Sequence, residues 1–321
     1  MKPPLIILTG PTAVGKTTTS IELAKRIGGE IISADSMQVY KHMDIGSAKI
    51  KPSEMSGIPH YLIDVLEPRE EFNVVRFKEM AMQALEEIYA KGKIPIVVGG
   101  TGFYIQALLY DIDFTENTED SSYRRELEDT LKTYGNAFLH KQLEDVDPGA
   151  ALEIHPNNIK RVIRALEFYH SSGQQISQHN EKERQKESPY NFLYFVLNDN
   201  RALLYERINK RVDQMIEQGL VEEVIQLKNM GLTREMVSMQ GLGYKEILAF
   251  LEEDITLEEA VILLKRDTRH FAKRQLTWFR REKDVIWINK DEMDYNEEKI
   301  LDKMLVFIKV ARISHKSLFQ I

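Results

Sequence analysis

A phosphate-binding loop near the start of the chain limits its possible folds strongly. The loop fits the pattern G-x-x-x-x-G-K-[ST] and lies between the apolar run Leu5–Leu8 and a helical pattern over Thr17–Ile27. Its glycines let successive backbone N–H groups point at phosphate oxygens, and the helix start adds a positive dipole end. We expect Lys16 to neutralise phosphate charge and the Thr17 hydroxyl to bind Mg²⁺; a Gly-rich turn without a ligand is the alternative. The loop consists of Gly10, Pro11, Thr12, Ala13, Val14, Gly15, Lys16 and Thr17.

Apolar runs and helical patterns alternate through the first third of the chain. After Leu5–Leu8, strands are expected at Glu30–Ser33, His60–Val65 and Ile94–Val98, with a helix at Val74–Lys91 between the last two. This β-α-β order predicts an α/β fold, a P-loop NTPase-like core with a parallel sheet flanked by helices.

The middle of the chain has helical periodicity and little strand pattern. Helices are expected at Tyr123–Tyr134, Ala137–Glu144 and Asn158–His170, between the polar stretches Asp111–Ser122 and Gln178–Pro189. We therefore expect an all-helical insertion domain over residues 115–189, between core segments 1–114 and 190–321. The last segment is expected to hold strands Phe192–Leu197 and Val285–Ile288 and helices Arg201–Glu217, Val221–Asn229, Tyr244–Glu252, Leu257–Arg281 and Asn296–Ala311.

Composition excludes several classes of function. The 321 residues contain no cysteine, which excludes disulfides, cysteine-bound metals and a cysteine nucleophile. The eight histidines show no metal-binding spacing, and no apolar run approaches the length of about 18 residues that a membrane span needs. We expect a cytoplasmic protein without membrane contact. A net charge of −7 excludes a general basic field, so nucleic acid would have to bind to local patches.

A carboxylate and a second Gly-rich turn follow two of the expected strands. Asp35 comes after Ile31–Ala34, and Thr101 lies in Gly99–Gly102 after Ile94–Val98. The carboxyl ends of parallel strands line the ligand crevice, so Asp35 is a candidate general base, or else a turn residue that caps the next helix. No acid ends the Ile94–Val98 strand to help bind Mg²⁺, which argues against a motor ATPase or a GTPase.

Three groups of cations are candidates for binding phosphates. Residues 265–283 hold eight Lys or Arg against two acids, interleaved with aromatic residues; this suits RNA, or a solvated helix with a buried aromatic face. The pair Arg207 and Arg211 suits a diphosphate or a surface ion-pair network. Within residues 265–283, four cations fall on one predicted helix face: Arg266, Arg269, Lys273 and Arg280. The third group lies in the predicted helix that ends at His170 and consists of Lys160, Arg161 and Arg164.

Eight strings, in order along nearly the whole chain, resemble the tRNA dimethylallyltransferase (tRNA isopentenyltransferase) family, bacterial type. Those around Asp35–Tyr40 and Lys273–Arg280 are the most specific, whereas the phosphate loop alone occurs in many families. The strings are Gly10–Thr17, Ile32–Tyr40, Met43–Lys49, Pro59–Asp64, Gly99–Tyr104, His155–Glu167, Gly241–Glu246 and Phe271–Arg280.

This resemblance implies transfer of a dimethylallyl group from dimethylallyl diphosphate to N6 of the adenine 3′ of the anticodon in tRNA. By resemblance, Asp35, Thr101 and Lys16 are catalytic, Arg211 binds diphosphate, and Mg²⁺ is the cofactor. A monomer that binds the anticodon stem-loop is expected. The residues expected to contact tRNA are Asp35, Ser36, Met37, Gln38, Thr101, Arg124, Lys160, Arg161, Arg164, Gly243, Tyr244, Lys273, Arg274 and Arg280.

Three other functions share part of this pattern. A small-molecule P-loop kinase would have a similar fold and helical lid, but it leaves the basic, aromatic segment without a role. A prenyltransferase acting on free adenine nucleotides would share the loop and Asp35, again without needing RNA-binding patches. A non-catalytic RNA-binding protein with a relict loop would have no need for Lys16, Thr17 and Asp35.

Overall fold

The computed structural model describes residues 2–114 and 121–313, and the chain divides into two units. The first comprises Met1–Leu109 and Pro189–Ile321. Its elements are β1 (Pro4–Thr9), α1 (Lys16–Ile27), β2 (Gly29–Ala34), β3 (His60–Tyr61), α2 (Val74–Ala90), β4 (Ile94–Gly99), α3 (Gly102–Leu109), β5 (Asn191–Asn198), α8 (Arg201–Glu217), α9 (Leu220–Asn229), α10 (Tyr244–Leu251), α11 (Leu257–Phe279), β6 (Val285–Asn289) and α12 (Glu297–Val310).

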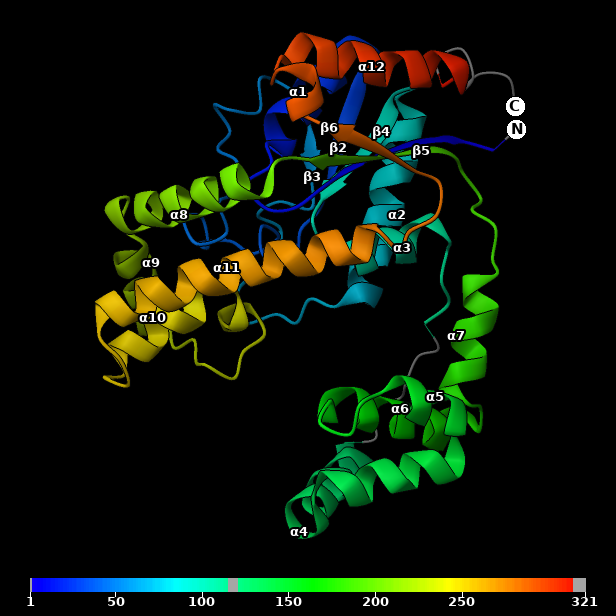
Figure 1. Cartoon of the computed structure of the whole chain (residues 1–321), viewed down its shortest axis with the longest axis vertical. Coiled ribbons are helices and arrows are strands. Elements are labelled where there is room, and N and C mark those ends of the chain that lie inside the picture. The colour runs from blue at the N-terminus through cyan, green and yellow to red at the C-terminus, as the bar shows by residue number, and fades with distance from the viewer. Residues whose placement is uncertain (1, 115–120, 314–321) are drawn as a thin grey trace. The chain divides into compact units, whose positions relative to one another are not determined.

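The strands form one parallel sheet with the order β3-β2-β4-β1-β5-β6, which confirms the predicted α/β fold (Figure 1). Every residue of β1 and β2 is buried, because helices cover both faces of the sheet. The third strand is shorter than predicted over His60–Val65 and ends at Tyr61. Leu62 and Asp64 have φ angles of +61° and +55°, which no extended strand can contain.

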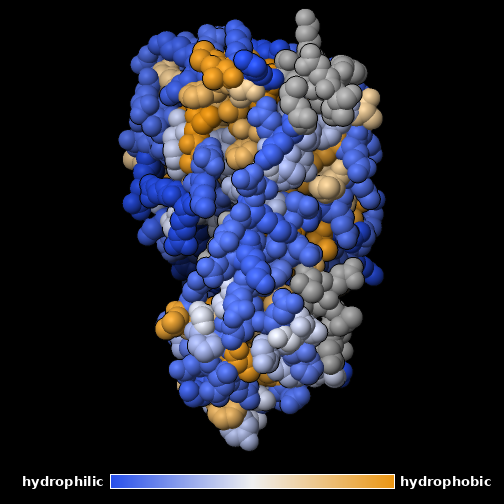
Figure 2. Space-filling model, turned by 90° about the vertical axis from the view of Figure 1, so that its right-hand side faces the viewer, coloured by the Kyte–Doolittle hydropathy of each residue, from blue (hydrophilic) through white to orange (hydrophobic). Residues whose placement is uncertain are grey.

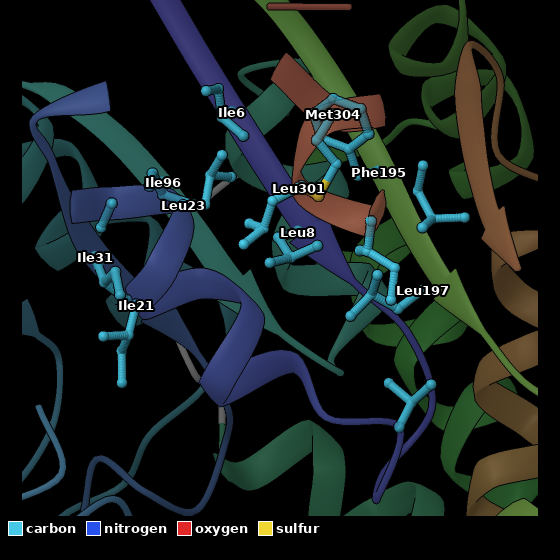
Figure 3. Packing of buried hydrophobic residues seen from close by; sticks show 14 of the residues in the cluster. Ile6, Leu8, Ile21, Leu23, Ile31, Ile96, Phe195, Leu197, Leu301 and Met304 are labelled. Atoms are coloured by element: carbon cyan, nitrogen blue, oxygen red, sulfur yellow. The ribbon is translucent and has the colours of Figure 1, made fainter. Parts of the chain in front are cut away.

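One face of the sheet packs against α1 and α12, which lie side by side (Figure 1). Ile6 and Leu8 of β1 point into this layer together with Phe195 and Leu197 of β5, and Leu301 of α12 meets them from the other side (Figure 3). Alternate side chains along a strand point to opposite faces, so Leu5 and Ile7 are buried on the other face. The strand that leads into the phosphate loop is therefore packed on both faces.

The second unit, Tyr110–Ser188, is all-helical and has its own apolar core. Gly135 has φ 81° and ψ 176°, so it breaks the first helix between the two helical segments expected on either side of it. The elements of this unit are α4 (Ser121–Val146), α5 (Pro148–Glu153), α6 (Ile159–Ser172) and α7 (Ile176–Arg184).

The polar stretch Gln178–Pro189, for which no helix was predicted, is partly helical, since α7 extends to Arg184. Asp147, buried at the start of α5, accepts hydrogen bonds from the backbone N–H of Ser177 (3.0 Å) and from its hydroxyl (2.6 Å). The first turn of α7 is therefore tied to α5 by a polar anchor that hydrophobic periodicity cannot detect. Of the expected hinge or linker, Asp111–Ser122, residues 115–120 lie outside the described part.

The described surface is mostly polar and also exposes some large apolar side chains. The face drawn in Figure 2 is largely hydrophilic, with hydrophobic patches between hydrophilic areas. None of the described helices is long and apolar enough to span a membrane.

Candidate functional site

The phosphate loop follows β1 directly and reverses the chain into α1. Gly10, Ala13 and Gly15 have φ angles of +148°, +63° and +98°. A Cβ atom on Gly10 would lie 2.4 Å from the carbonyl oxygen of Leu197, so only glycine fits there. Within the described residues, the backbone N–H groups of Gly15, Lys16 and Thr17 have no hydrogen-bond acceptor. These donors and the α1 dipole make a cradle for an anion.

Lys16 lies across this cradle and is held by the loop itself. Its Nζ donates to the carbonyl oxygens of Gly10 and Pro11, each at 3.0 Å. Burial lowers the pKa of Lys16 to about 8, while Asp35 raises it and Arg211 lowers it further. Lys16, Asp35 and Arg211 are thus within electrostatic range of one another, although they come from α1, the end of β2 and α8.

Arg211 is the second cation of the site. Burial lowers the pKa of its guanidinium, and it forms no hydrogen bond or ion pair with any other described residue. Arg211 is half-buried, and a guanidinium withdrawn from water in this way is normally paired with an acid or bound to an anionic ligand. Together with Lys16 and the free N–H groups, Arg211 makes the site suited to a diphosphate.

The neighbouring Arg207 has a different partner. It forms an ion pair with the buried carboxylate of Asp199, which directly follows β5 and also accepts a hydrogen bond from the Tyr295 hydroxyl (3.1 Å). The ion-pair alternative therefore holds for Arg207. Asp199 is an acid just beyond a strand next to β1 that the sequence patterns did not reveal, and its carboxylate is engaged by these partners.

Asp35 lies just beyond β2, and the two oxygens of its carboxylate have different surroundings. One oxygen, Oδ1, accepts hydrogen bonds from the backbone N–H of Met37 (2.8 Å) and Gln38 (3.3 Å). The other, Oδ2, has no hydrogen-bond partner among the described residues. The turn-residue and general-base interpretations are therefore compatible, because one oxygen serves the turn while the second stays available to accept a proton.

Thr101 lies beside Asp35 because their strands are paired. Ala34 and Gly99 are register partners at the ends of β2 and β4, and the backbone N–H of Thr101 donates to the carbonyl oxygen of Ala34 (3.3 Å). A Cβ atom on Gly99 would lie 2.1 Å from that same oxygen. The glycine lets the two chain segments approach closely enough for Asp35 and Thr101 to share one crevice.

Two residues at the loop were missed as site residues. Gln275 of α11 accepts from the backbone N–H of Thr12 and donates to the carbonyl oxygen of Gly100, both at 2.9 Å. Lys290, after β6, donates to the carbonyl oxygen of Val14 at 3.4 Å. Both side chains come from segments far along the chain; Gln275 stood in a noted string, but no sequence pattern showed that it points inward.

Tyr244 and Gly243 do not agree with the predicted contact to tRNA. The Tyr244 side chain is fully buried and donates its hydroxyl to Glu223 at 2.8 Å. Its ring packs against Gly46, where an added Cβ would lie 2.6 Å away, and the N–H of Gly243 is used by Glu246 at 2.8 Å. These residues have little surface to offer an RNA; they support the segment that follows Tyr40.

Glu223 anchors the segment that follows Tyr40. Its carboxylate accepts hydrogen bonds from three consecutive N–H groups, those of Asp44 (2.9 Å), Ile45 (2.7 Å) and Gly46 (3.1 Å). The side-chain Nε2 of Gln38 donates a hydrogen bond to the same segment, at 3.4 Å from the carbonyl oxygen of Ser47. The chain beyond Asp35 is thus a braced wall of the crevice.

The cations of α11 are less uniform than predicted. Arg266 pairs with Asp267 at 2.7 Å, and Arg269 donates to Asn209 of α8 at 2.6 Å, so neither is a free member of one basic face. Lys273 and Arg280 are exposed without ion-pair partners among the described residues. A hollow of about 410 Å³ is lined by His270, Lys273, Arg274, Thr277, Trp278 and Arg281.

Trp278 connects this hollow to the second Gly-rich turn. A Cβ atom on Gly102 would lie 2.2 Å from the Trp278 ring, and Phe103, which is 42% exposed, meets that ring edge-on at 6.2 Å. A cation-lined hollow with accessible aromatic side chains suits a phosphate backbone and an unstacked base. It lies on the same helix as Gln275.

A larger hollow of about 570 Å³ lies at the opposite end of the strands, where β5 begins. Its lining includes Asn191 and Phe192 at the beginning of β5, whereas the phosphate loop follows the carboxyl end of β1. None of the catalytic or diphosphate-binding candidates lines it, so we assign it no function.

The helical unit, taken by itself, carries its own exposed cations. Arg124 is half exposed and forms ion pairs with Glu128 and Glu167, each at 3.3 Å. Lys160, Arg161 and Arg164 are exposed on α6 and have no ion-pair partner among the described residues. The three unpaired cations therefore offer a stronger phosphate-binding surface than Arg124.

The residues present fit Mg²⁺ only as a partner of a bound diphosphate. No group of three or more acids or histidines in the described part could hold a metal by itself. The Thr17 side chain is exposed at the first turn of α1. Mg²⁺ commonly binds through few protein ligands plus phosphate oxygens and water, an arrangement that Thr17 suits.

Comparison with known proteins gives consistent matches. The family model described as IPP transferase matches residues 38–282. A tRNA dimethylallyltransferase of Lachnoclostridium phytofermentans is 64% identical over 97% of this chain and 99% of its own length, and one of Acetivibrio thermocellus is 52% identical over 95% and 97%. The crystal structure of a Bacillus halodurans tRNA isopentenylpyrophosphate transferase, 44% identical, superposes with a TM-score of 0.74 and covers 99% of both chains.

Proposed function

Because the chain belongs to the IPP transferase family, we propose that it transfers a dimethylallyl group from dimethylallyl diphosphate to N6 of the adenine 3′ of the anticodon in tRNA. The observation that carries this proposal is the grouping of Lys16, Arg211 and Asp35 at the carboxyl edge of the sheet. Two cations suit a departing diphosphate, and a carboxylate beside them suits an incoming amine.

In the proposed reaction the bond between C1 of the prenyl group and the diphosphate oxygen breaks, and a bond between C1 and N6 forms. Negative charge grows on the departing diphosphate. The N–H groups of Gly15 and Thr17 stabilise that charge from the loop, together with the Lys16 ammonium that the same loop holds and with Arg211 of α8. The phosphate loop thus holds a leaving group and does not donate a phosphoryl group.

Asp35 receives the proton that N6 loses as the new bond forms. Its Oδ1 is fixed by Met37 and Gln38, so Oδ2 is the oxygen that faces the amine. The Thr101 hydroxyl, positioned beside it through Ala34, provides a hydrogen bond that orients the adenine. These are the catalytic roles that the family resemblance implies for Asp35 and Thr101.

We include Mg²⁺ in this proposal as a partner of the diphosphate at the Thr17 hydroxyl. When bound there, it supplies Lewis-acid stabilisation of the phosphate oxygens. Since Lys16, Arg211, Asp35 and Thr101 all belong to one chain, we also propose that a monomer contains a complete catalytic site.

The proposed tRNA contacts are the unpaired cations Lys273 and Arg280 on α11 and the α6 cations of the helical unit. An adenine inside a folded anticodon loop must be turned out of its stack to reach Asp35. This requirement gives the aromatic side chains of the Trp278 hollow a function that a small-molecule kinase would not need.

The test is to incubate the protein with dimethylallyl diphosphate, Mg²⁺ and unmodified tRNA, and to digest the RNA to nucleosides. We expect N6-isopentenyladenosine at the position 3′ of the anticodon. A product found only on free AMP would instead identify an adenylate prenyltransferase. ATP turnover without any prenylated nucleoside would identify a kinase, and either result would overturn the proposal.

A further inference from the structure

The side chain of Gln275 bridges the two Gly-rich loops of the site. Its Oε1 accepts from the Thr12 N–H and its Nε2 donates to the Gly100 carbonyl oxygen, both at 2.9 Å. Only 5% of the residue is exposed, so water does not replace either bond. Because one loop presents a donor and the other an acceptor, an uncharged amide satisfies both in a single orientation.

The packing around this bridge is as restrictive as its hydrogen bonds. A Cβ atom on Gly100 would lie 2.1 Å from the Gln275 Nε2. Gly100 is therefore a glycine so that the amide can reach its backbone. This close contact and the two hydrogen bonds together hold the two loops at a defined separation.

The two loops hold groups that act on opposite partners of the reaction. The loop beginning at Gly10 carries Lys16, which faces the diphosphate. The residue after Gly100 is Thr101, which lies beside Asp35. The distance that Gln275 sets is thus the distance between the leaving group and the side chains that receive the amine.

The same helix also presents cations to the surface on either side of Gln275. Lys273 and Arg274 come just before it and are exposed, and Arg280 follows at the helix end. A ligand that binds these cations contacts the helix from which the bridge projects. No other described glutamine side chain forms bonds to both loops.

We propose that Gln275 is a positioning residue, whose amide holds the diphosphate loop and the Thr101 turn at the separation at which the prenyl carbon and the adenine amine meet. This inference rests on the proposed function. It predicts a loss in the rate of transfer at saturation, because the diphosphate-binding groups and the surface cations remain in place. An error of about 1 Å in such alignment costs about 100-fold in rate.

Two variants test this. Gln275→Leu removes both hydrogen bonds at similar volume, and Gln275→Glu keeps the acceptor for Thr12 but turns an oxygen toward the Gly100 carbonyl. We expect kcat to fall about 10- to 100-fold in both, while the Kd values for inorganic diphosphate and for tRNA change less than twofold. The matched control is Gln226→Glu on the exposed surface of α9.

The pH profile distinguishes a positioning role from general loss of structure. When the carboxyl group introduced by Gln275→Glu is protonated, it donates to the Gly100 carbonyl as the amide does, so the ratio of wild-type to Gln275→Glu kcat should shrink as the pH is lowered. The corresponding ratio for Gln275→Leu should stay flat. Thermal unfolding of each variant reports the folded fraction, to which kcat is normalised.

The inference is overturned if both variants keep kcat within twofold of wild type, or if normalisation to the folded fraction removes the defect. It is also overturned if the Kd for diphosphate rises by the same factor as kcat falls, since the bridge would then only shape the diphosphate site. Failure of the wild-type protein to prenylate tRNA would contradict the proposed function instead, so the two failures are distinguishable.

Discussion

Lys16 lies within electrostatic range of Arg211, a second half-buried cation that opposes the protonation of the lysine. Burial is the larger cause and lowers the pKa of Lys16 to about 8, against the opposite effect of Asp35. Neighbouring like charges raise the free energy of a site, and a bound anion removes that cost. The two neighbouring cations therefore make a site whose electrostatics favour an anion such as diphosphate.

The first prediction concerns the pH dependence of diphosphate binding. The pKa of Lys16 in the free protein is lowered to about 8, and a bound anion raises it, so binding takes up a proton at higher pH. The Kd for dimethylallyl diphosphate should rise above pH 8, approaching about tenfold per pH unit. Titration calorimetry should show this rise in wild type and not in Lys16→Arg, whose guanidinium stays charged. Identical profiles for the two proteins would contradict it.

Arg211→Gln should weaken diphosphate binding about 10- to 100-fold, since a charge-assisted hydrogen bond contributes about 1.5–3 kcal/mol. Loss of the neighbouring positive charge should also raise the pKa of Lys16, moving the pH midpoint upward. The matched control is Lys210→Gln, an exposed cation one position earlier on α8. Equal Kd values for the two variants would show that Arg211 does not contact the ligand.

Asp35→Asn should lower the rate of prenyl transfer by about 10²–10⁴-fold, the range for loss of a general base. The amide still offers an oxygen to the N–H groups of Met37 and Gln38, so the turn should persist. Filter binding should give a tRNA Kd within twofold of wild type. Near-normal turnover by Asp35→Asn would mean that another group accepts the proton.

Lys160, Arg161 and Arg164 should contribute to tRNA binding through phosphates. Changing all three to glutamine should reduce the slope of log Kd against log salt by about two to three, since each phosphate contact contributes about 0.7–0.9. Lys132→Gln is the control, because Lys132 is already paired with Asp129 at 2.9 Å in the same unit. An unchanged slope in the triple variant would remove α6 from the RNA-binding surface.

Local patterns in the sequence predicted the features that one short stretch of sequence encodes. The phosphate loop, the strand before it and Asp35 were found because one short string contains both the fold signal and the chemistry. The break at Gly135 was likewise anticipated by the two separate helical periods on either side. By contrast, α7 was missed, because its first turn is held by the buried carboxylate of Asp147.

Partners from distant segments could not be predicted in this way. Nothing in the sequence shows that Gln275 reaches the loop at Thr12, or that Asp199 occupies Arg207 while Arg211 stays unpaired among the described residues. Tyr244 stood in a string that matches the family, yet its side chain is buried against Gly46. A matching string identifies a residue type, and only packing shows whether the side chain faces the ligand or supports those that do.

The fate of two labels distinguishes a leaving group from a phosphoryl donor. Dimethylallyl diphosphate is prepared with radiocarbon in the prenyl group and radiophosphorus in the diphosphate, and is incubated with the protein, Mg²⁺ and unmodified tRNA. If the phosphate loop holds a leaving group, radiocarbon should enter tRNA while an equal amount of radiophosphorus is released as intact diphosphate. Radiophosphorus transferred to an acceptor, or release of diphosphate without radiocarbon in tRNA, would contradict this account.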